Sequence, residues 1–204
     1  VFIGLTFLHL QNVVHSDLKA ENIAFVTLTN EKTKMKTNVF EKIIKDKEIR
    51  EELNKCPSLE NLSKEAMKIV KELSNYEIKI VDFGSAKINK RNKKLSGITG
   101  TAYYCSPEIV HENYSFPCDE WACGVMMYIL LTGIPPFQGN TEDEIFENVL
   151  KSEPNLDIEE LKDVTPECKD LISKLLQKDS KKRITAKEAL KHPFFEVGVH
   201  IQNL

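Results

Sequence analysis

One stretch decides the fold of this chain: His15-Ser16-Asp17-Leu18-Lys19-Ala20-Glu21-Asn22, in which a carboxylate, an ammonium and an amide group lie close together. A second run, Asp82-Phe83-Gly84, follows the apolar segment Ile78-Lys79-Ile80-Val81. Carboxylate and amide oxygens are ligands that suit Mg²⁺, and a lysine beside them neutralises phosphate charge. The two runs together therefore predict a site that positions a phosphoryl group for transfer.

The composition limits the classes of protein to which this site can belong. The 204 residues are 41% hydrophobic and carry a net charge of −3, which suits one sizeable core in one or two domains. That charge gives no general attraction to nucleic acid or to an anionic membrane, so we expect neither as a partner. The cysteines form no C-x-x-C pair, which favours reduced thiols in the cytoplasm or nucleus. They are Cys56, Cys105, Cys118, Cys123 and Cys168.

Two apolar stretches imitate targeting or membrane segments. Residues 1–10 lack the basic flank and the small-residue cleavage site of a secretory signal, so we interpret them as the end of a buried helix. Residues 121–137 are shorter than the roughly 20 residues that a membrane span needs, and Gly133-Ile134-Pro135-Pro136 interrupts them. We therefore expect a central core helix there, and neither secretion nor a transmembrane segment.

Further motifs follow the first two runs in order along the chain. They are Gly100-Thr101-Ala102-Tyr103-Tyr104-Cys105-Ser106-Pro107-Glu108, Asp119-Glu120-Trp121-Ala122-Cys123-Gly124, Pro135-Pro136-Phe137, Lys182-Arg183-Ile184 and His192-Pro193-Phe194-Phe195. With these motifs the chain resembles, from Val1 to Leu204 and apart from one insertion, the C-terminal lobe of eukaryotic Ser/Thr protein kinases. It is most similar to their calcium-dependent and calmodulin-dependent branch. The resemblance implies a protein-kinase-like α+β fold, of which this chain is the mainly helical C-lobe, with short β-hairpins near the catalytic loop and no N-lobe.

The resemblance also assigns catalytic roles to residues of the two runs. Asp17 would orient or accept the proton of a substrate hydroxyl, and Lys19 would neutralise the phosphate in transfer. Thr101 would link these two side chains. Asn22 and Asp82 would hold Mg²⁺ against the phosphates of ATP, so ATP and Mg²⁺ are the expected cofactors. A lysine at position 19 indicates Ser/Thr rather than Tyr substrates.

A second group of motif residues is expected to be structural. Glu108 and Arg183 resemble a buried ion pair that ties the activation segment to the lower helices, and Asp119 resembles the acid that braces the catalytic-loop backbone. The group that packs around the site is His15, Phe83 and Gly84. For His15, a core histidine is the expected role, and not a base or a metal ligand.

Ser16 is the one mismatch to the H-R-D-L-x-x-x-N pattern, because the family usually has an arginine there that clamps an activation-loop phosphate. The candidate phosphosites Ser96 and Thr99 follow the basic run Lys87–Lys94. We hypothesise that activation does not depend on that clamp. The basic run itself is either a solvated loop, which we favour, or a docking site.

The resemblance also assigns one residue to the nucleotide pocket and one to substrate recognition. Ala24 lies where the family has a larger aliphatic residue under the adenine ring, so the floor of the pocket is less filled. Glu21 resembles the acid that reads a basic residue upstream of the phosphoacceptor, while a second acidic position of some relatives is Ile129 here. We therefore expect protein substrates with a modest preference for upstream basic residues.

The largest departure lies between the segments 23–26 and 78–81, which read as paired strands. A hairpin loop usually takes about 2–5 residues, whereas a helical or low-complexity insertion spans about residues 28–76 here. Two stretches within it, 39–44 and 62–73, show helical periodicity. The insertion either docks a partner or is merely tolerated, and we lean toward the second.

Several kinase features are missing from these 204 residues. They contain no G-x-G-x-x-G loop, no strand lysine paired with a helix glutamate and no EF-hand pattern. We therefore expect the isolated chain to be inactive, with an N-lobe upstream in the complete protein and any calcium-sensing module outside this chain. The alternative to an active kinase is a pseudokinase or scaffold that uses the fold for binding.

Overall fold

The computed structural model describes residues 1–27, 48, 63–65, 67–68, 76–90 and 93–197. Most of the predicted insertion, with the apolar stretch 39–44, lies outside these described residues. Residues 64–65 and 67–68 are helical, within the second periodic stretch. Tyr76, which we assigned to the insertion, already belongs to a strand.

Helices dominate the described residues, and the strands are short. The α-helices are α1 (Phe2–Leu10), α5 (Pro107–Val110), α6 (Pro117–Thr132), α7 (Glu142–Lys151), α8 (Pro166–Leu175), α9 (Ala186–Ala189) and α10 (Pro193–Val197). The 3₁₀ turns are η1 (Ala20–Asn22), η3 (Ala102–Tyr104) and η4 (Glu159–Leu161). The strands are β1 (Val13–Val14), β2 (Ile23–Thr27), β3 (Tyr76–Ile80) and β4 (Lys87–Ile88).

The four strands form two antiparallel pairs around the loop that carries Asp17. Strand β2 pairs with β3 so that Ile23 lies opposite Ile80. Strand β1 pairs with β4 so that Val14 lies opposite Lys87. The predicted pairing of segments 23–26 and 78–81 is thus confirmed, and both ends of the run Asp82-Phe83-Gly84 are anchored to strands.

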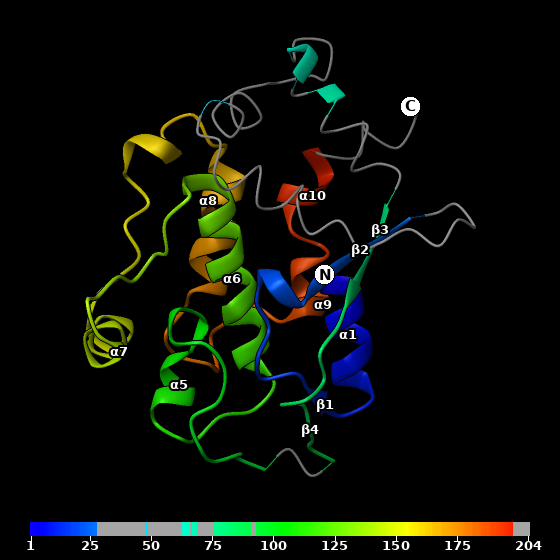
Figure 1. Cartoon of the computed structure of the whole chain (residues 1–204), viewed down its shortest axis with the longest axis vertical. Helices are drawn as coiled ribbons and strands as arrows, with labels where there is room; N and C mark the ends of the chain where they lie inside the picture. The colour runs from blue at the N-terminus through cyan, green and yellow to red at the C-terminus, as the bar shows by residue number, and fades with distance from the viewer. Residues whose placement is uncertain (28–47, 49–62, 66, 69–75, 91–92, 198–204) are drawn as a thin grey trace.

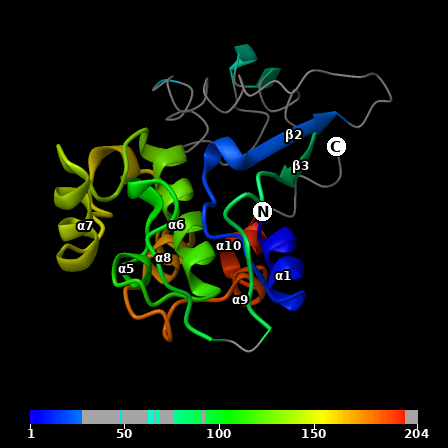
Figure 2. The same cartoon turned by 60° about the horizontal axis from the view of Figure 1, so that its bottom comes forward.

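Helix α6 runs through the middle of the molecule, with α8 beside it (Figure 1; Figure 2 gives a second view). Trp121 and Val125 of α6 are fully buried, which confirms the predicted core helix. The two helices approach closely at Gly124, where an added Cβ would lie 2.8 Å from Cβ of Leu175. Helix α6 ends at Gly133, whose φ of 79° is one that other residues adopt seldom. The packing of apolar side chains around α6 therefore fixes the position of α8 relative to α6.

Threonine caps begin three of these helices. The side chains of Thr141, Thr165 and Thr185 accept hydrogen bonds from backbone N–H groups in the first turns of α7, α8 and α9. A reciprocal capping box forms at Thr185 and Glu188. These caps account for the helix starts from local sequence.

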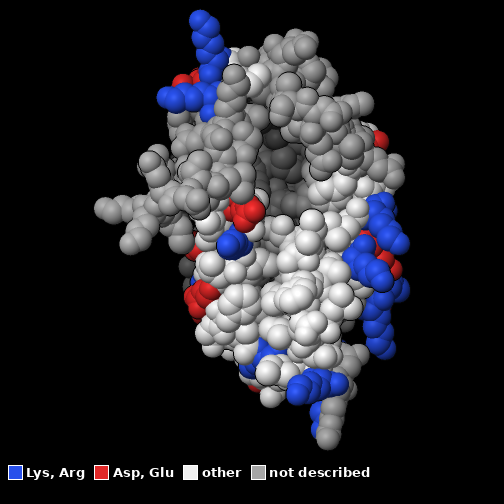
Figure 3. Space-filling view, turned by 90° about the vertical axis from the view of Figure 1, so that its right-hand side faces the viewer, with Lys and Arg blue, Asp and Glu red and all other residues white. Residues whose placement is uncertain are grey.

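The face of the molecule around α1 is largely uncharged. Ile3, Phe7 and Leu10 of α1 are more than half exposed. Uncharged side chains cover much of the lower half of this face, below an acidic and a basic side chain near its centre, and Lys and Arg side chains gather at its lower end and along one margin (Figure 3). Within the described ranges, every helix is too short or too polar to span a bilayer.

Candidate active site

The loop that carries Asp17 is anchored to α6 through one buried carboxylate. The oxygens of Asp119, at the start of α6, accept hydrogen bonds from the backbone N–H groups of His15 and Ser16, each at 2.9 Å. Asp119 is 1% exposed. Burying a carboxylate is costly unless hydrogen bonds or an opposite charge offset the cost, so these two bonds fix where the loop begins.

Three predicted site residues, Asp17, Lys19 and Thr101, meet beyond this anchor. The ammonium of Lys19 lies 3.2 Å from Oδ2 of Asp17 and donates a hydrogen bond of 3.1 Å to Oγ1 of Thr101. Lys19 therefore bridges a carboxylate on one loop and a hydroxyl from a segment 82 residues further along the chain. The other oxygen of Asp17, Oδ1, is buried without a hydrogen-bond partner among the described residues.

The two predicted metal ligands, Asn22 and Asp82, are brought to the same end of the β2–β3 hairpin. The backbone N–H of Val81 donates to the carbonyl of Asn22 at 3.0 Å. Asp82 is the next residue after Val81, so this bond holds the backbone of Asp82 close to that of Asn22. The side-chain nitrogen of Asn22 donates to the carbonyl of Asp17 at 2.8 Å. Asp82 is exposed, and its Oδ1 accepts from the N–H of Gly84 at 3.2 Å.

His15 and Phe83 lie against each other beneath Asp82. Their rings make an edge-on contact with centroids 5.2 Å apart, and Nε2 of His15 donates to the carbonyl of Val81 at 3.1 Å. His15 is fully buried, whereas Phe83 is 46% exposed. The core role expected for His15 thus agrees with its burial, while half of the Phe83 ring faces outward.

The predicted ion pair of Glu108 and Arg183 joins the start of α5 to the segment before α9. The guanidinium donates to both carboxylate oxygens, and the distance from Nη2 to Oε2 is 2.9 Å. Arg183 also donates to the carbonyl of Pro117 at 2.7 Å and stacks over Trp121. Both charged groups are buried, so the pair connects the lower helices through the core.

His9 is a polar residue of this region to which the sequence assigned no role. Its Nε2 lies 2.9 Å from Asp119 and its Nδ1 lies 3.3 Å from Oε1 of Glu120. Burial alone would lower the pKa of His9, but the hydrogen bonds and charges of the two carboxylates outweigh it and raise the pKa from 6.5 to about 9. The sequence could not predict this contact, because α1 and α6 are far apart in the chain. Its one signal was a histidine near the end of the helix that precedes the catalytic loop.

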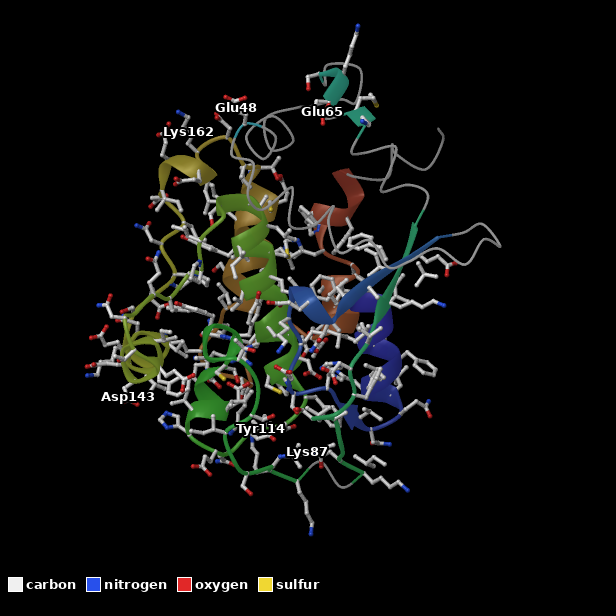
Figure 4. The ribbon with its side chains drawn as sticks, viewed as in Figure 1. Glu48, Glu65, Lys87, Tyr114, Asp143 and Lys162 are labelled. Atoms are coloured by element: carbon white, nitrogen blue, oxygen red, sulfur yellow. The ribbon has the colours of Figure 1, made fainter. Side chains whose placement is uncertain are left out.

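The segment that follows Gly84 is held by Lys87 and Tyr114. The ammonium of Lys87 donates to the Tyr114 hydroxyl at 2.5 Å and to the carbonyl of Ser96 at 3.2 Å, at the lower end of the molecule (Figure 4). Leu95 and Tyr114 exchange two backbone hydrogen bonds. Ser96 is exposed, and Thr99 is half-buried.

Two other predicted positions flank the site. Ala24, on β2, is buried, and Glu21 is exposed on η1. Burial, and to a smaller extent the charge of Glu21, raises the pKa of Tyr104 on η3 to about 12. The roles of Ala24 in nucleotide binding and of Glu21 in substrate binding remain predictions.

A carboxylate with one unpaired oxygen, a neighbouring lysine, and a second acid and amide nearby form a set that suits phosphoryl transfer. Comparison with known sequences agrees. Residues 1–195 match the model of the family described as protein kinase domain.

Named relatives include calcium-dependent protein kinase 4 of Plasmodium falciparum (isolate 3D7), 34% identical over 98% of this chain and 30% of the relative. Calcium-dependent protein kinase 29 of Arabidopsis thaliana is 43% identical over 66% of this chain and 25% of its own length. The calcium/calmodulin-dependent serine/threonine-protein kinase 1 of Oryza sativa subsp. japonica is 34% identical over 93% of this chain and 24% of the relative. The chain thus spans less than a third of the length of these relatives.

Proposed function

The chain belongs to the protein kinase domain family, close to the calcium-dependent kinases, and on that premise we propose that it transfers the γ-phosphate of ATP to Ser or Thr hydroxyls of proteins. The observation that carries the proposal is the group formed by Asp17, Lys19 and Thr101. A cavity of about 10 Å³, room for about one water molecule, is lined by Asp17 and Thr101.

In this proposal Asp17 positions the hydroxyl that attacks the phosphate. Because Oδ1 of Asp17 is buried, a substrate hydroxyl would donate its hydrogen to Oδ2, the oxygen that also lies beside Lys19. Lys19 lies where it can neutralise the charge that develops on the transferred group. Thr101 holds the ammonium in place through its hydroxyl, so it acts on the reaction by positioning Lys19.

The donor set fits Mg²⁺. Because the side-chain nitrogen of Asn22 is bonded to the carbonyl of Asp17, Oδ1 is the atom of this amide that a cation can use. Asp82 supplies a carboxylate from the same end of the β2–β3 hairpin, and Mg²⁺ commonly takes one or two protein oxygens together with phosphate and water. Asn22 and Asp82 would hold the Mg²⁺, which would neutralise part of the charge on the ATP phosphates.

We further propose that these residues form the C-lobe of the kinase, with the insertion at about 28–76 between the catalytic loop and Asp82. Without a Gly-rich loop the 204 residues cannot cover the nucleotide by themselves, so the isolated chain should have negligible activity. Calcium control would then come from a module outside this chain, and the cytoplasm or nucleus is the expected location. Every activity experiment therefore uses the full-length protein.

The test is a phosphotransfer assay on the full-length protein with and without Ca²⁺, comparing wild type with Asp17→Asn and Asp82→Ala. Each variant should lose at least about a hundredfold in kcat. Asp157→Asn, which changes an exposed aspartate between α7 and α8, is the matched control and should leave the rate unchanged. Thr101→Ser should keep most of the activity that Thr101→Ala loses.

Two results would reject this function. Phosphotransfer that survives both Asp17→Asn and Asp82→Ala would show that these residues are not the site. A wild-type protein that is folded and binds ATP, yet transfers no phosphate to any peptide in a random library, would favour the pseudokinase instead.

A further inference from the structure

Ser16 is a buried residue that connects two loops of the site. It is 4% exposed, and its hydroxyl donates a hydrogen bond of 2.8 Å to the backbone carbonyl of Ser85, 69 residues further along the chain. Ser16 therefore replaces the arginine with a different contact. A short side chain instead makes a direct bond to the residue that follows Gly84.

The neighbouring residue, His15, makes a parallel contact on the other side of Asp82-Phe83-Gly84. Its Nε2 donates to the carbonyl of Val81 at 3.1 Å. Two consecutive side chains of the catalytic loop thus bind the carbonyls immediately before and after this run. The Asp82 loop is bracketed at both ends by the loop that carries Asp17.

Asp82 needs such support because its backbone has a φ of 61°, which residues other than glycine adopt seldom. A conformation of this kind persists only where the surrounding structure holds it. Ser16 has a φ of 62° and is itself held by Asp119, which accepts from its N–H at 2.9 Å. The chain of contacts therefore runs from the buried end of α6 through Ser16 to the carbonyl of Ser85.

We propose that Ser16 is a positioning residue for the metal-binding loop: its hydroxyl, with the imidazole of His15, holds Asp82 in place without an activation-loop phosphate. This proposal rests on the proposed kinase function, because Asp82 binds metal only in that function. The hydrogen bond between Ser16 and Ser85 can nevertheless be tested without catalysis. The backbone N–H groups of Val81, Gly84 and Ala86 are bonded within or next to this loop, so their hydrogen exchange reports on its order.

The experiment compares amide hydrogen exchange in the full-length protein without nucleotide, as wild type, Ser16→Ala, Ser16→Gly and Ser16→Thr. Glycine relieves the positive φ but removes the hydroxyl, while threonine keeps the hydroxyl and adds backbone strain. Exchange over residues 81–88 should be roughly twofold to tenfold faster in the Ala and Gly variants, as expected for the loss of one hydrogen bond. The Thr variant, which keeps the hydroxyl but carries the strain, should exchange more slowly there than the Ala variant, and α6 and α8 should be unchanged in all three variants.

Kinetics provide the second measurement. The Mg²⁺ concentration for half-maximal activity should rise by a similar factor in Ser16→Ala and Ser16→Gly, with the KM for peptide unchanged. Ser152→Ala, at an exposed serine after α7, is the control and should match wild type.

The outcomes separate this inference from the proposed function. If Ser16→Gly exchanges like wild type over residues 81–88, the hydroxyl does not hold the loop and the inference is overturned. If the loop loosens as expected but wild-type protein transfers no phosphate, the contact stands and the kinase proposal fails.

Discussion

The carboxylate of Asp119 lies 2.9 Å from the imidazole of His9, although 110 residues separate them in the chain. The same carboxylate holds the amides of His15 and Ser16, so the charge of His9 balances the group that anchors the catalytic loop. Glu120 faces the other ring nitrogen. A protonated His9 therefore offsets two buried negative charges between α1 and α6.

This arrangement predicts a pH-dependent stability. The pKa of His9 is about 9 in the folded protein, against 6.5 for an unperturbed histidine, so the folded state binds the proton more tightly than the unfolded state. Its contribution is fully present below about pH 6.5 and is lost as the pH rises toward 9. The free energy of unfolding of wild type should exceed that of His9→Gln by up to about 3 kcal/mol at pH 6, and the difference should vanish near pH 9.5.

Urea unfolding across this pH range measures the difference directly. His111→Gln, at an exposed histidine after α5, serves as the control and should follow the wild-type curve. Parallel curves for wild type and His9→Gln would show that His9 is not charged in the folded state.

Breaking the ion pair of Glu108 and Arg183 should destabilise the protein strongly. Arg183→Met leaves the carboxylate of Glu108 buried without its partner, at a cost of about 3–5 kcal/mol. The double variant Glu108→Gln, Arg183→Met should lose less than the sum of the two single variants. Thermal unfolding of all three measures this coupling. Glu147→Gln, which breaks a fully exposed pair with Lys151, should change the melting temperature little, and equal effects at both sites would contradict the buried role.

Activity should not require phosphorylation of the segment after Gly84. Lys87 already ties this segment to Tyr114 and to the carbonyl of Ser96, and the arginine that would bind a phosphate is replaced by Ser16. The double variant Ser96→Ala, Thr99→Ala of the full-length protein should keep kcat/KM within roughly twofold of wild type. Loss of activity in this variant, measured on dephosphorylated protein, would show that a phosphate is needed after all.

Glu21 should give substrates a modest preference for basic residues. Its carboxylate is exposed on η1, and exposed ion pairs contribute only about 0.2–1 kcal/mol. A peptide array should show Arg or Lys enriched by a small factor upstream of the phosphoacceptor, and Glu21→Gln should remove that enrichment. An array without any enrichment for wild type would refute the assignment.

Much of the fold could be predicted because it depends on local sequence. A core helix was expected within residues 121–137, and α6 covers Pro117–Thr132, so its existence was predicted but its bounds were not. The paired strands and the caps at Thr141, Thr165 and Thr185 follow from periodicity or from bonds within one turn. One detail departs from the Thr-x-x-Glu pattern, which is typical of a reciprocal capping box. The side chain of Glu144 binds the N–H of Asn140 rather than that of Thr141, so the capping box at α7 is not reciprocal.

The sequence by itself determined the residue types of the site and their order, because phosphoryl transfer needs an acid, a lysine and oxygen ligands at set positions. The tertiary structure alone decided which distant groups complete them: the carbonyl of Ser85 for Ser16, and the carboxylate of Asp119 for His9. The physical reason is that spacing along a chain fixes geometry over a few residues only. The charge of His9 and the role of Ser16 depend on groups more than sixty residues away.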